Sequence, residues 1–248
     1  MIPPTSIDGT DITGATIDGT DVQEITVDGD VVFNRFQGPD SVVEQFNAQT
    51  AFDSSDINTQ VTSWTGEKQG ITATGNGAIV RSNGINGFQS LEFDGSDDFF
   101  QVLDTDFPDT LQPYTIIAVV ELFSTGTLYQ ATSGADSGQR AGHLLWNGSR
   151  WVAFSQNALL GSFDSTVRML TGVYDGNNGQ LRENGTQTAN GNIGADSLTS
   201  ISIGRRGGEF NDREWDGYIG FVEIHDGLPT NGLSNREQEV ANLWNITI

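Results

Sequence analysis

The stretch of residues 213–244 constrains the fold more than any other, because a long β-type run is followed there by a turn and a helical pattern. Trp-Asp-Gly at residues 215–217 is a turn signal that leads into residues 218–225, where bulky apolar side chains occupy nearly every position. Asp226 and Gly227 provide the turn signal that ends such a run. The stretch therefore predicts a long central-type strand near the end of the chain.

A short amphipathic helix is expected after a loop rich in Gly, Pro and Asn. Ser234 and Glu237 have the spacing of a capping box, in which the Ser oxygen accepts from an orphan backbone N–H and the Glu side chain reaches back. Val240, Leu243 and Trp244 then fall on one helical face. The pattern predicts one helix in an almost wholly β chain.

The remaining chain alternates short β-type runs with turn signals, which is typical of an all-β sandwich or jelly roll. Residues 114–123 form the longest apolar run and are expected to be a central strand covered on both faces. Hairpins are expected over residues 144–154 and 169–183, and Asn184-Gly185 is a further two-residue turn. With 248 residues and no cysteine, the chain can form one large sandwich without disulfides.

Four motifs occur in the order of a known fold family: residues 90–98 (SLEFDGSDD), 170–185, 201–204 (ISIG) and 216–226. Together they resemble the strands of laminin-G-like, concanavalin-A-type jelly rolls. The resemblance covers residues 41–248 and implies a β-sandwich with one short C-terminal helix. It implies no particular ligand, because one fold serves many functions.

Residues 1–36 contain a ten-residue repeat of a β-branched residue, Asp-Gly and further β-branched residues. Asp-Gly between such residues is a strong signal for a hairpin or tight turn. Units this small cannot bury a face alone, so we expect an anchoring or oligomerising β-segment, with a homotrimer as first choice. The alternative is a flexible acidic tail, although its regular Ile and Val are unusual for disorder. Residues 37–40 are the expected linker to a domain of residues 41–248.

The net charge of -22 comes from 33 acidic and 11 basic residues, of which only Lys68 is a lysine. A composition poor in lysine and rich in aspartate resembles that of proteins from extreme halophiles. In those proteins, hydrated carboxylates keep the surface soluble in concentrated salt. The alternative is an ordinary acidic protein. Such a charge argues against nucleic acid as a partner. No stretch approaches the ~20 apolar residues of a membrane span, and residues 1–5 have no features of a secretory signal.

Catalysis is not expected, although this jelly roll also occurs in glycoside hydrolases. Those enzymes need two carboxylates that flank the bond, and neither an E-x-D-x-x-E nor an E-x-D-x-E spacing occurs here. Glu223 and His225 share one strand face, so a carboxylate–base pair is conceivable, but such pairs are far more often salt bridges or hydrogen bonds. A Ser-His-Asp triad is also unexpected, because neither His143 nor His225 lies near a nucleophile elbow.

Two turns offer oxygen ligands of the kind that Ca²⁺ prefers, at residues 94–98 (DGSDD) and 175–178 (DGNN). Neither matches an EF-hand loop, and both are ordinary turn sequences in a chain rich in Asp and Gly. We therefore expect turns without a metal and no cofactor. The family resemblance keeps open Ca²⁺ at the rim of the sandwich.

Arginine and tryptophan cluster in two places, where they are candidates for binding a sugar. Trp stacks on the apolar face of a pyranose, and Arg forks to hydroxyls, carboxylates or sulfates. The alternative is that the tryptophans fill the core and the arginines pair with local acids. The candidate ligand-binding residues are Trp146, Arg150, Trp151, Arg205, Arg206, Arg213 and Trp215.

The leading hypothesis is a surface protein of a virus from a salt-rich habitat, of the haloarchaeal tailed-virus type. It would be a tail fibre, a spike or a capsid-vertex decoration, made in the host cytoplasm without a signal peptide. Residues 1–36, whose repeat resembles runs near the N-termini of virus tail proteins, would contact other virion proteins, and the lectin-like domain would bind a host glycan or glycoprotein. One alternative is a carbohydrate-active enzyme or its binding module. Another is a structural decoration protein without a ligand.

Overall fold

The computed structural model describes residues 6–7, 10–11, 25–27, 30–33, 41–125, 128–135, 141–166, 168–207 and 213–248. The chain divides into two compact units, Met1–Ser41 and Val42–Ile248. The expected linker at residues 37–40 lies outside the described residues. Among the described helices, none has the length and apolar character needed to cross a bilayer.

The first unit contains two small antiparallel hairpins in its described residues. β1 (Ser6–Ile7) pairs with β2 (Thr10–Asp11), and β3 (Ile25–Val27) pairs with β4 (Asp30–Phe33). These hairpins coincide with the first and third copies of the ten-residue repeat. The second copy, at residues 17–22, lies outside the described residues.

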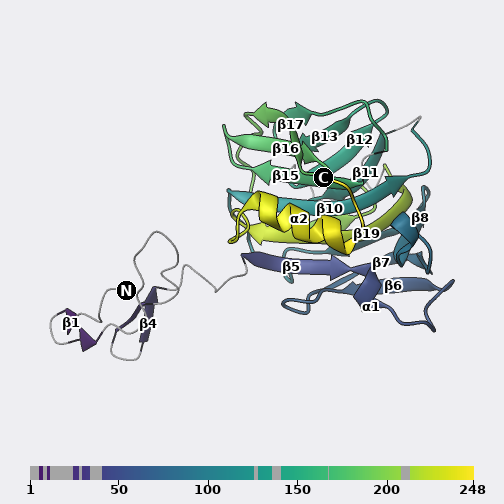
Figure 1. The fold of residues 1–248 in the computed structure, drawn as a ribbon. Helices are drawn as coiled ribbons and strands as arrows, with labels where there is room; N and C mark the ends of the chain where they lie inside the picture. Colours follow the sequence, from purple (N-terminus) through teal and green to yellow (C-terminus); the bar gives the residue numbers. More distant parts are fainter. Residues whose placement is uncertain are drawn as a thin grey trace. The chain divides into compact units, whose positions relative to one another are not determined.

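The second unit is a β-sandwich with one short C-terminal helix, as predicted (Figure 1). Its first strands are β5 (Val42–Asn47), β6 (Gln60–Thr65), β7 (Thr72–Arg81), β8 (Ser90–Asp94), β9 (Phe99–Val102), β10 (Tyr114–Leu122) and β11 (Leu128–Ser133). The later strands are β12 (His143–Asn147), β13 (Trp151–Phe154), β14 (Ala158–Leu160), β15 (Met169–Tyr174), β16 (Gly179–Glu183), β17 (Thr186–Gly191), β18 (Ile201–Ile203) and β19 (Asp216–Asp226). The helices are α1 (Ala48–Ala51), a 3₁₀ turn η1 (Ile85–Gly87) and α2 (Leu233–Leu243).

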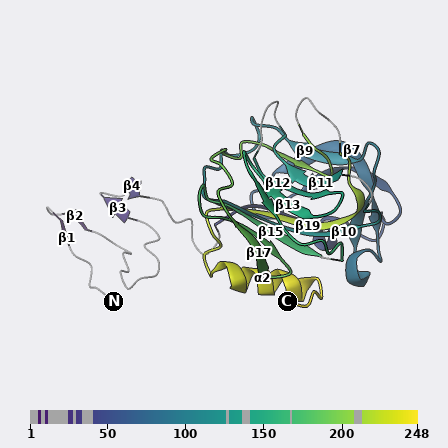
Figure 2. The ribbon, with the colours of Figure 1, turned by 90° about the horizontal axis from the view of Figure 1, so that it is seen from above.

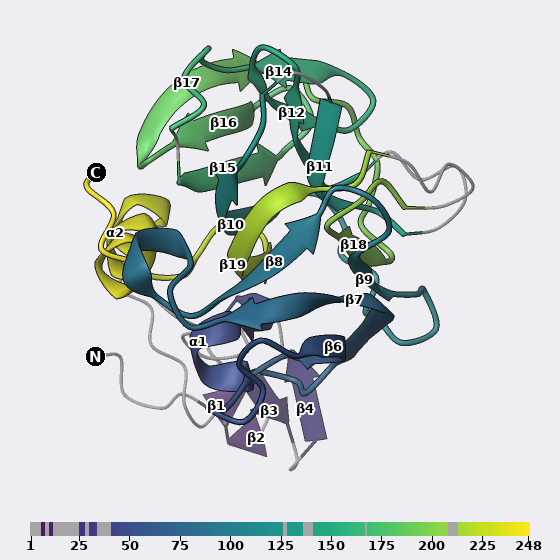
Figure 3. The ribbon, with the colours of Figure 1, turned by 90° about the vertical axis from the view of Figure 1, so that its right-hand side faces the viewer.

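The long strand β19 is the centre of the sheet topology. One edge of β19 pairs with β10 along its whole length, whereas the other edge pairs first with β8 and then with β5. β8 also pairs with β7, so the sheet continues from β10 through β19 and β8 to β7, as Figure 3 shows. From β7 the order runs through β9, β18, β11 and β12 to β13 and β14. The prediction of a long central strand at residues 218–225 is confirmed.

The sheet folds over on itself, so that strands distant in the pairing order face each other across the core (Figure 2). Tyr114 of β10 and Tyr174 of the neighbouring strand β15 are opposite each other in one layer, and their rings stack with centroids 4.6 Å apart. The Tyr174 hydroxyl donates to the carbonyl of His143 in β12 at 2.8 Å, and the Gly142 N–H donates to the Tyr114 hydroxyl oxygen at 3.0 Å. Both phenols therefore make their hydrogen bonds across the two layers, as buried polar groups require.

The predicted hairpins are present. β12 pairs with β13, and β15 pairs with β16, both antiparallel. Between β16 and β17, Asn184 and Gly185 have φ values of 44° and 76°. A two-residue hairpin loop of type I′ requires positive φ at both positions, which Asn-Gly tolerates better than other pairs.

The strand β10 is covered on both faces, as its continuous apolar run predicted. Ile116, Ala118 and Val120 point into the core between the layers, whereas Ile117 and Val119 lie in a second cluster under α2. Trp244 fills that second cluster and is fully buried. A Cβ on Gly220 of β19 would lie 2.2 Å from the Trp244 ring, so the indole packs directly on the glycine backbone.

The predicted capping box at the start of α2 is wrong. The N-cap is Gly232 with φ 91°, and no side chain caps the helix, because Ser234 lies inside its first turn. Glu237 is instead fully buried and accepts from the guanidinium of Arg182 on β16, Nη2 to Oε2 at 2.8 Å. The apolar face also differs from the prediction at Leu243, which is 42% exposed. The helix is oriented by its contacts with the sheet rather than by a local cap.

Candidate ligand-binding rim

Two segments distant in the sequence meet at one end of the sandwich. Trp215, which directly precedes β19, donates its N–H to the carbonyl of Gly204, just after β18, at 2.6 Å. Its own carbonyl accepts from the N–H of Gly95 in the β8–β9 turn at 2.9 Å. We call the β8–β9 turn (residues 94–98), Arg205, Arg206 and the segment 213–215 the rim.

Arg205 of the rim is held in place by contacts of its guanidinium group with two residues of β9. Its guanidinium carbon lies 3.1 Å from the centre of the Phe99 ring, and its Nη2 donates to Oε1 of Gln101 at 3.1 Å. Burial lowers the pKa of the Arg205 guanidinium, an effect that the nearby Glu214 carboxylate offsets in part. Stacking on the ring and one directed hydrogen bond hold the planar group in a fixed orientation.

No local pattern in the sequence indicates Phe99 or Gln101 as partners of Arg205. They lie on β9, which is brought beside β18 by the pairing of Phe100 with Ile203. A contact of this kind depends on the order of strands in the sheet, which no local pattern encodes. The two other predicted arginines of the rim, Arg206 and Arg213, are half-buried.

The predicted tryptophans lie in the core and join the two predicted clusters there. Trp146 and Trp151 meet edge to face at 5.1 Å, and Trp151 stacks against Trp215 at 6.4 Å. All three are buried, and each indole N–H donates to a backbone carbonyl: of Thr125, Asp164 and Tyr218 in turn. Their ring faces therefore offer no stacking surface to a sugar, in agreement with the alternative interpretation as core residues.

Arg150, the remaining predicted residue, does not share the environment of Arg205. Its guanidinium carbon lies 3.9 Å from the centre of the Phe163 ring, and Phe163 itself is 66% exposed. The pair is a cation–π contact on the surface beside β13. The two clusters predicted from the sequence are therefore linked through their buried indoles. The guanidinium groups of Arg150 and Arg205, in contrast, contact different aromatic rings.

The acidic turn of the rim brings three carboxylates together. One oxygen from each of Asp94, Asp97 and Asp98 lies within 4.8 Å of the other two. Burial raises the pKa of Asp98 to about 6, and the charges of Asp94 and Asp97 add to the effect. Burial and Asp94 also raise the pKa of Asp216. Hard oxygen ligands at such separations suit Ca²⁺. Residues 175–178, the other candidate turn, contain a single carboxylate, that of Asp175.

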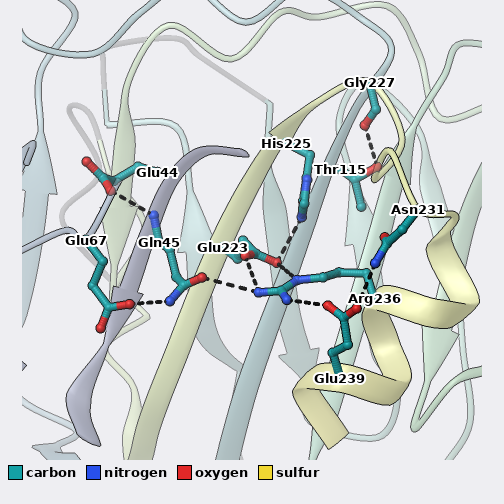
Figure 4. Close-up of polar contacts among 10 residues, drawn as sticks. All are labelled: Glu44, Gln45, Glu67, Thr115, Glu223, His225, Gly227, Asn231, Arg236 and Glu239. Atoms are coloured by element: carbon teal, nitrogen blue, oxygen red, sulfur yellow. Dashed lines mark hydrogen bonds and ion pairs between the residues drawn. The ribbon is translucent and has the colours of Figure 1, made fainter. Parts of the chain in front are cut away.

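The predicted pair of Glu223 and His225 exists, but it lies inside the protein. Nε2 of His225 is 2.9 Å from Oε2 of Glu223, and both side chains are buried on the face of β19 that α2 covers. Figure 4 shows Arg236 reaching from α2 to the same carboxylate, which accepts from Nε at 2.9 Å and Nη2 at 2.7 Å. The pair forms the hydrogen-bonded contact that was expected as the alternative to a catalytic pair, as part of a buried network.

The charge state of this network follows from its hydrogen bonds. Burial alone raises the pKa of Glu223, but the bonds from His225 and Arg236 outweigh burial and leave that pKa below its ordinary value. Gln45 of β5 extends the network, since its Oε1 accepts from Arg236 Nη2 at 3.2 Å and its amide donates to Glu67. An ionised, multiply bonded carboxylate under a helix is suited to holding α2 on the sheet.

Comparisons with known proteins identify the fold. No protein-family model matches the chain, and no curated protein matches it. Solved structures do match, and the three described below are 12–13% identical to this chain. The binding domain of botulinum neurotoxin DC in complex with rat synaptotagmin II is 12% identical, with a TM-score of 0.56 over 82% of this chain and 52% of that one.

Two further matches have similar scores. Trypanosoma rangeli sialidase in complex with sialic acid is 13% identical, with a TM-score of 0.54 over 84% of this chain and 34% of that one. The neurotoxin DC binding domain in complex with SialylT is 12% identical, with a TM-score of 0.53 over 84% of this chain and 51% of that one. The chain thus spans about a third to a half of these proteins, and the likeness establishes a β-sandwich fold.

Proposed function

We propose that the unit Val42–Ile248 is a carbohydrate-binding domain and that its rim binds an acidic glycan. The observation that carries the proposal is the concentration of arginines in one connection of the chain. Of 11 basic residues in a chain of net charge -22, Arg205, Arg206 and Arg213 fall within one connection, between β18 and β19. A fixed guanidinium recognises the carboxylate of an acidic sugar, or a sulfate, by paired hydrogen bonds.

The acidic turn fits this role if it holds a cation. Asp94, Asp97 and Asp98 would bind Ca²⁺ through their carboxylate oxygens, and the ion would neutralise the charge that otherwise repels an anionic ligand. The raised pKa of Asp98 reflects this uncompensated burial of negative charge. The Ca²⁺ ion would therefore strengthen binding at the rim without contributing to catalysis.

Structural neighbours support the same class of function. Two of the matched structures contain, by their descriptions, sialic acid or SialylT, and such ligands have the acidic character that the rim arginines would recognise. We propose binding rather than catalysis, because Glu223 and His225 are buried and the Glu223 carboxylate is bonded to both His225 and Arg236. A place on a virion surface, with oligomerisation through residues 1–36, stays a prediction from composition and the repeat.

The test is a glycan array that contains matched acidic and neutral glycans, probed with and without Ca²⁺ at ~0.15 M and ~2 M NaCl. We expect preferential binding to sialylated or sulfated glycans, stronger with Ca²⁺. Arg206→Ala and Arg213→Ala should each weaken that binding, whereas Arg150→Ala, which removes an arginine outside the rim, should not. The proposal fails if acidic glycans are not bound under any of these conditions, or if the rim variants bind as the wild type does.

A further inference from the structure

An aromatic corner lies on the outer face of the sheet, beyond the region that α2 covers. Phe123 directly follows β10 and is 51% exposed. Its ring meets Tyr218 of β19 edge to face, with centroids 4.8 Å apart and planes at 88°. An exposed phenylalanine in a fixed aromatic contact leaves one large apolar ring face open to a ligand.

Charged residues form a row beside this corner. The strand register places Glu121 of β10 opposite Tyr218, and Tyr218 opposite Glu92 of β8. Each glutamate has an arginine partner: Arg81 Nε lies 2.7 Å from Glu92, and Arg168 Nη2 lies 3.2 Å from Glu121. We define the outer aromatic patch as Arg81, Glu92, Glu121, Phe123, Arg168 and Tyr218.

The patch differs from the rest of the molecule in its charge. Its two arginines and two glutamates sum to zero, whereas the chain carries -22. The four charged side chains are 25–32% exposed, so their heads remain accessible while each ion pair holds them in place. A ligand at this patch meets as many positive as negative side chains, so the net charge of the patch does not favour an anionic ligand over a neutral one.

These features select one class of ligand. A peptide that added a strand would need an open edge, and β10 and β19 are both paired on both edges. The core of a protein interface is depleted in charged residues, whereas the exposed Phe123 is bordered here by charged side chains. A pyranose has an apolar face that stacks on an aromatic ring and a periphery of hydroxyls that bond to carboxylates and guanidinium groups.

We propose that the outer aromatic patch is a second binding site, which takes a neutral pyranose glycan. One sugar face packs on Phe123, and its hydroxyls bond to the pairs Glu121–Arg168 and Glu92–Arg81. This site goes beyond the proposed rim function, because none of its residues belongs to the rim and its ligand has no charge. The two sites adjoin, since the Phe123 N–H donates to the carbonyl of Asp216 at 3.0 Å.

The test is isothermal titration calorimetry of the full chain with three neutral probes: cellohexaose, maltohexaose and chitohexaose. We expect at least one probe to bind, and Phe123→Ala to weaken it about tenfold, because the stacking surface is lost. Phe163→Ala is the matched control, since that ring is also exposed but lies under Arg150, and the affinity should not change. Arg168→Met should weaken the same probe through lost hydroxyl contacts, with thermal melts showing that each variant is folded.

The outcomes separate this proposal from the rim function. Binding of a neutral probe that persists in Arg206→Ala and is lost in Phe123→Ala supports the patch even if no acidic glycan binds. Failure of all three probes to bind, or an unchanged affinity in Phe123→Ala, overturns the patch. Neither of those results affects the rim, whose acidic glycans are tested by the array.

Discussion

Replacing Arg236 with methionine should destabilise the protein by about 3 kcal/mol near pH 7. Arg236 provides two hydrogen bonds to Glu223, whose side chain is 0% exposed, while Arg236 itself is 21% exposed. Removing one partner of a buried pair costs about 3–5 kcal/mol, and the partial exposure of Arg236 puts this pair at the lower end. For a protein of this size the loss corresponds to about 6–12 °C in melting temperature.

The pH dependence of stability provides a second test of the role of Arg236. In the wild type the pKa of Glu223 is lowered, so its stabilising contribution is present above the unfolded-state pKa and is lost as pH falls through the folded pKa. In Arg236→Met, burial dominates and the pKa of Glu223 should rise. The carboxyl group can then take up a proton on mild acidification, and the destabilisation should shrink as pH falls from about 7 to about 5.

The assay is urea unfolding followed by the fluorescence of the buried tryptophans, with the slope checked for constancy between variants. Glu223→Gln with Arg236→Met should recover part of the loss, because no unpaired charge then remains buried. The control is Arg168→Met, which removes a partner of the half-exposed Glu121 at 3.2 Å and should cost less than about 1 kcal/mol. Equal losses in the two arginine variants would refute the reasoning.

Three other predictions concern packing and charge. Gly220→Ala places a methyl group 2.2 Å from the Trp244 ring and should cost about 1–3 kcal/mol in urea unfolding, with partial recovery in Gly220→Ala/Trp244→Phe. The pKa of Asp98 is raised to about 6 in the folded protein, so the folded state binds a proton there more readily than the unfolded chain does. Ionisation of Asp98 therefore lowers the stability of the folded state as pH rises. Asp98→Asn should therefore raise the melting temperature near pH 8 in EDTA; a lower value would contradict this. Dilution of NaCl from ~3 M to ~0.1 M should lower the melting temperature by circular dichroism, and a flat series would argue against halophilic adaptation.

The fold could be predicted because its signals are local. The apolar run that became β10 and the Asn184-Gly185 turn both reflect backbone preferences and burial that neighbouring residues determine. The prediction of a capping box was wrong because the contact that fixes Glu237 is not local in the sequence. Ser234 and Glu237 have the correct spacing, but a buried ion pair with Arg182 of β16 fixes Glu237, and that contact exists only in the folded sheet.

The candidate site was less predictable than the fold. The tryptophans and arginines lie close together in the sequence, yet burial separates them: the indoles pack in the core, and Arg205 stacks on Phe99 at the rim. The contact between Phe123 and Tyr218 could not be predicted, because both residues belong to apolar runs that indicate core strands. The exposure of this aromatic corner arises because α2 covers only part of the outer face, and the extent of that cover is a tertiary property.

The pairing of β19 has a consequence for biosynthesis. This strand is made after every other described strand of the unit Val42–Ile248, yet it lies between β10 on one edge and β8 and β5 on the other. Until it leaves the ribosome, all three neighbours keep open strand edges that invite pairing with other chains. Contacts between the two ends of a domain also slow folding, because a long loop must close before they form. A nascent chain stalled before residue 216 would therefore be prone to aggregation, even though most of its strands are already made.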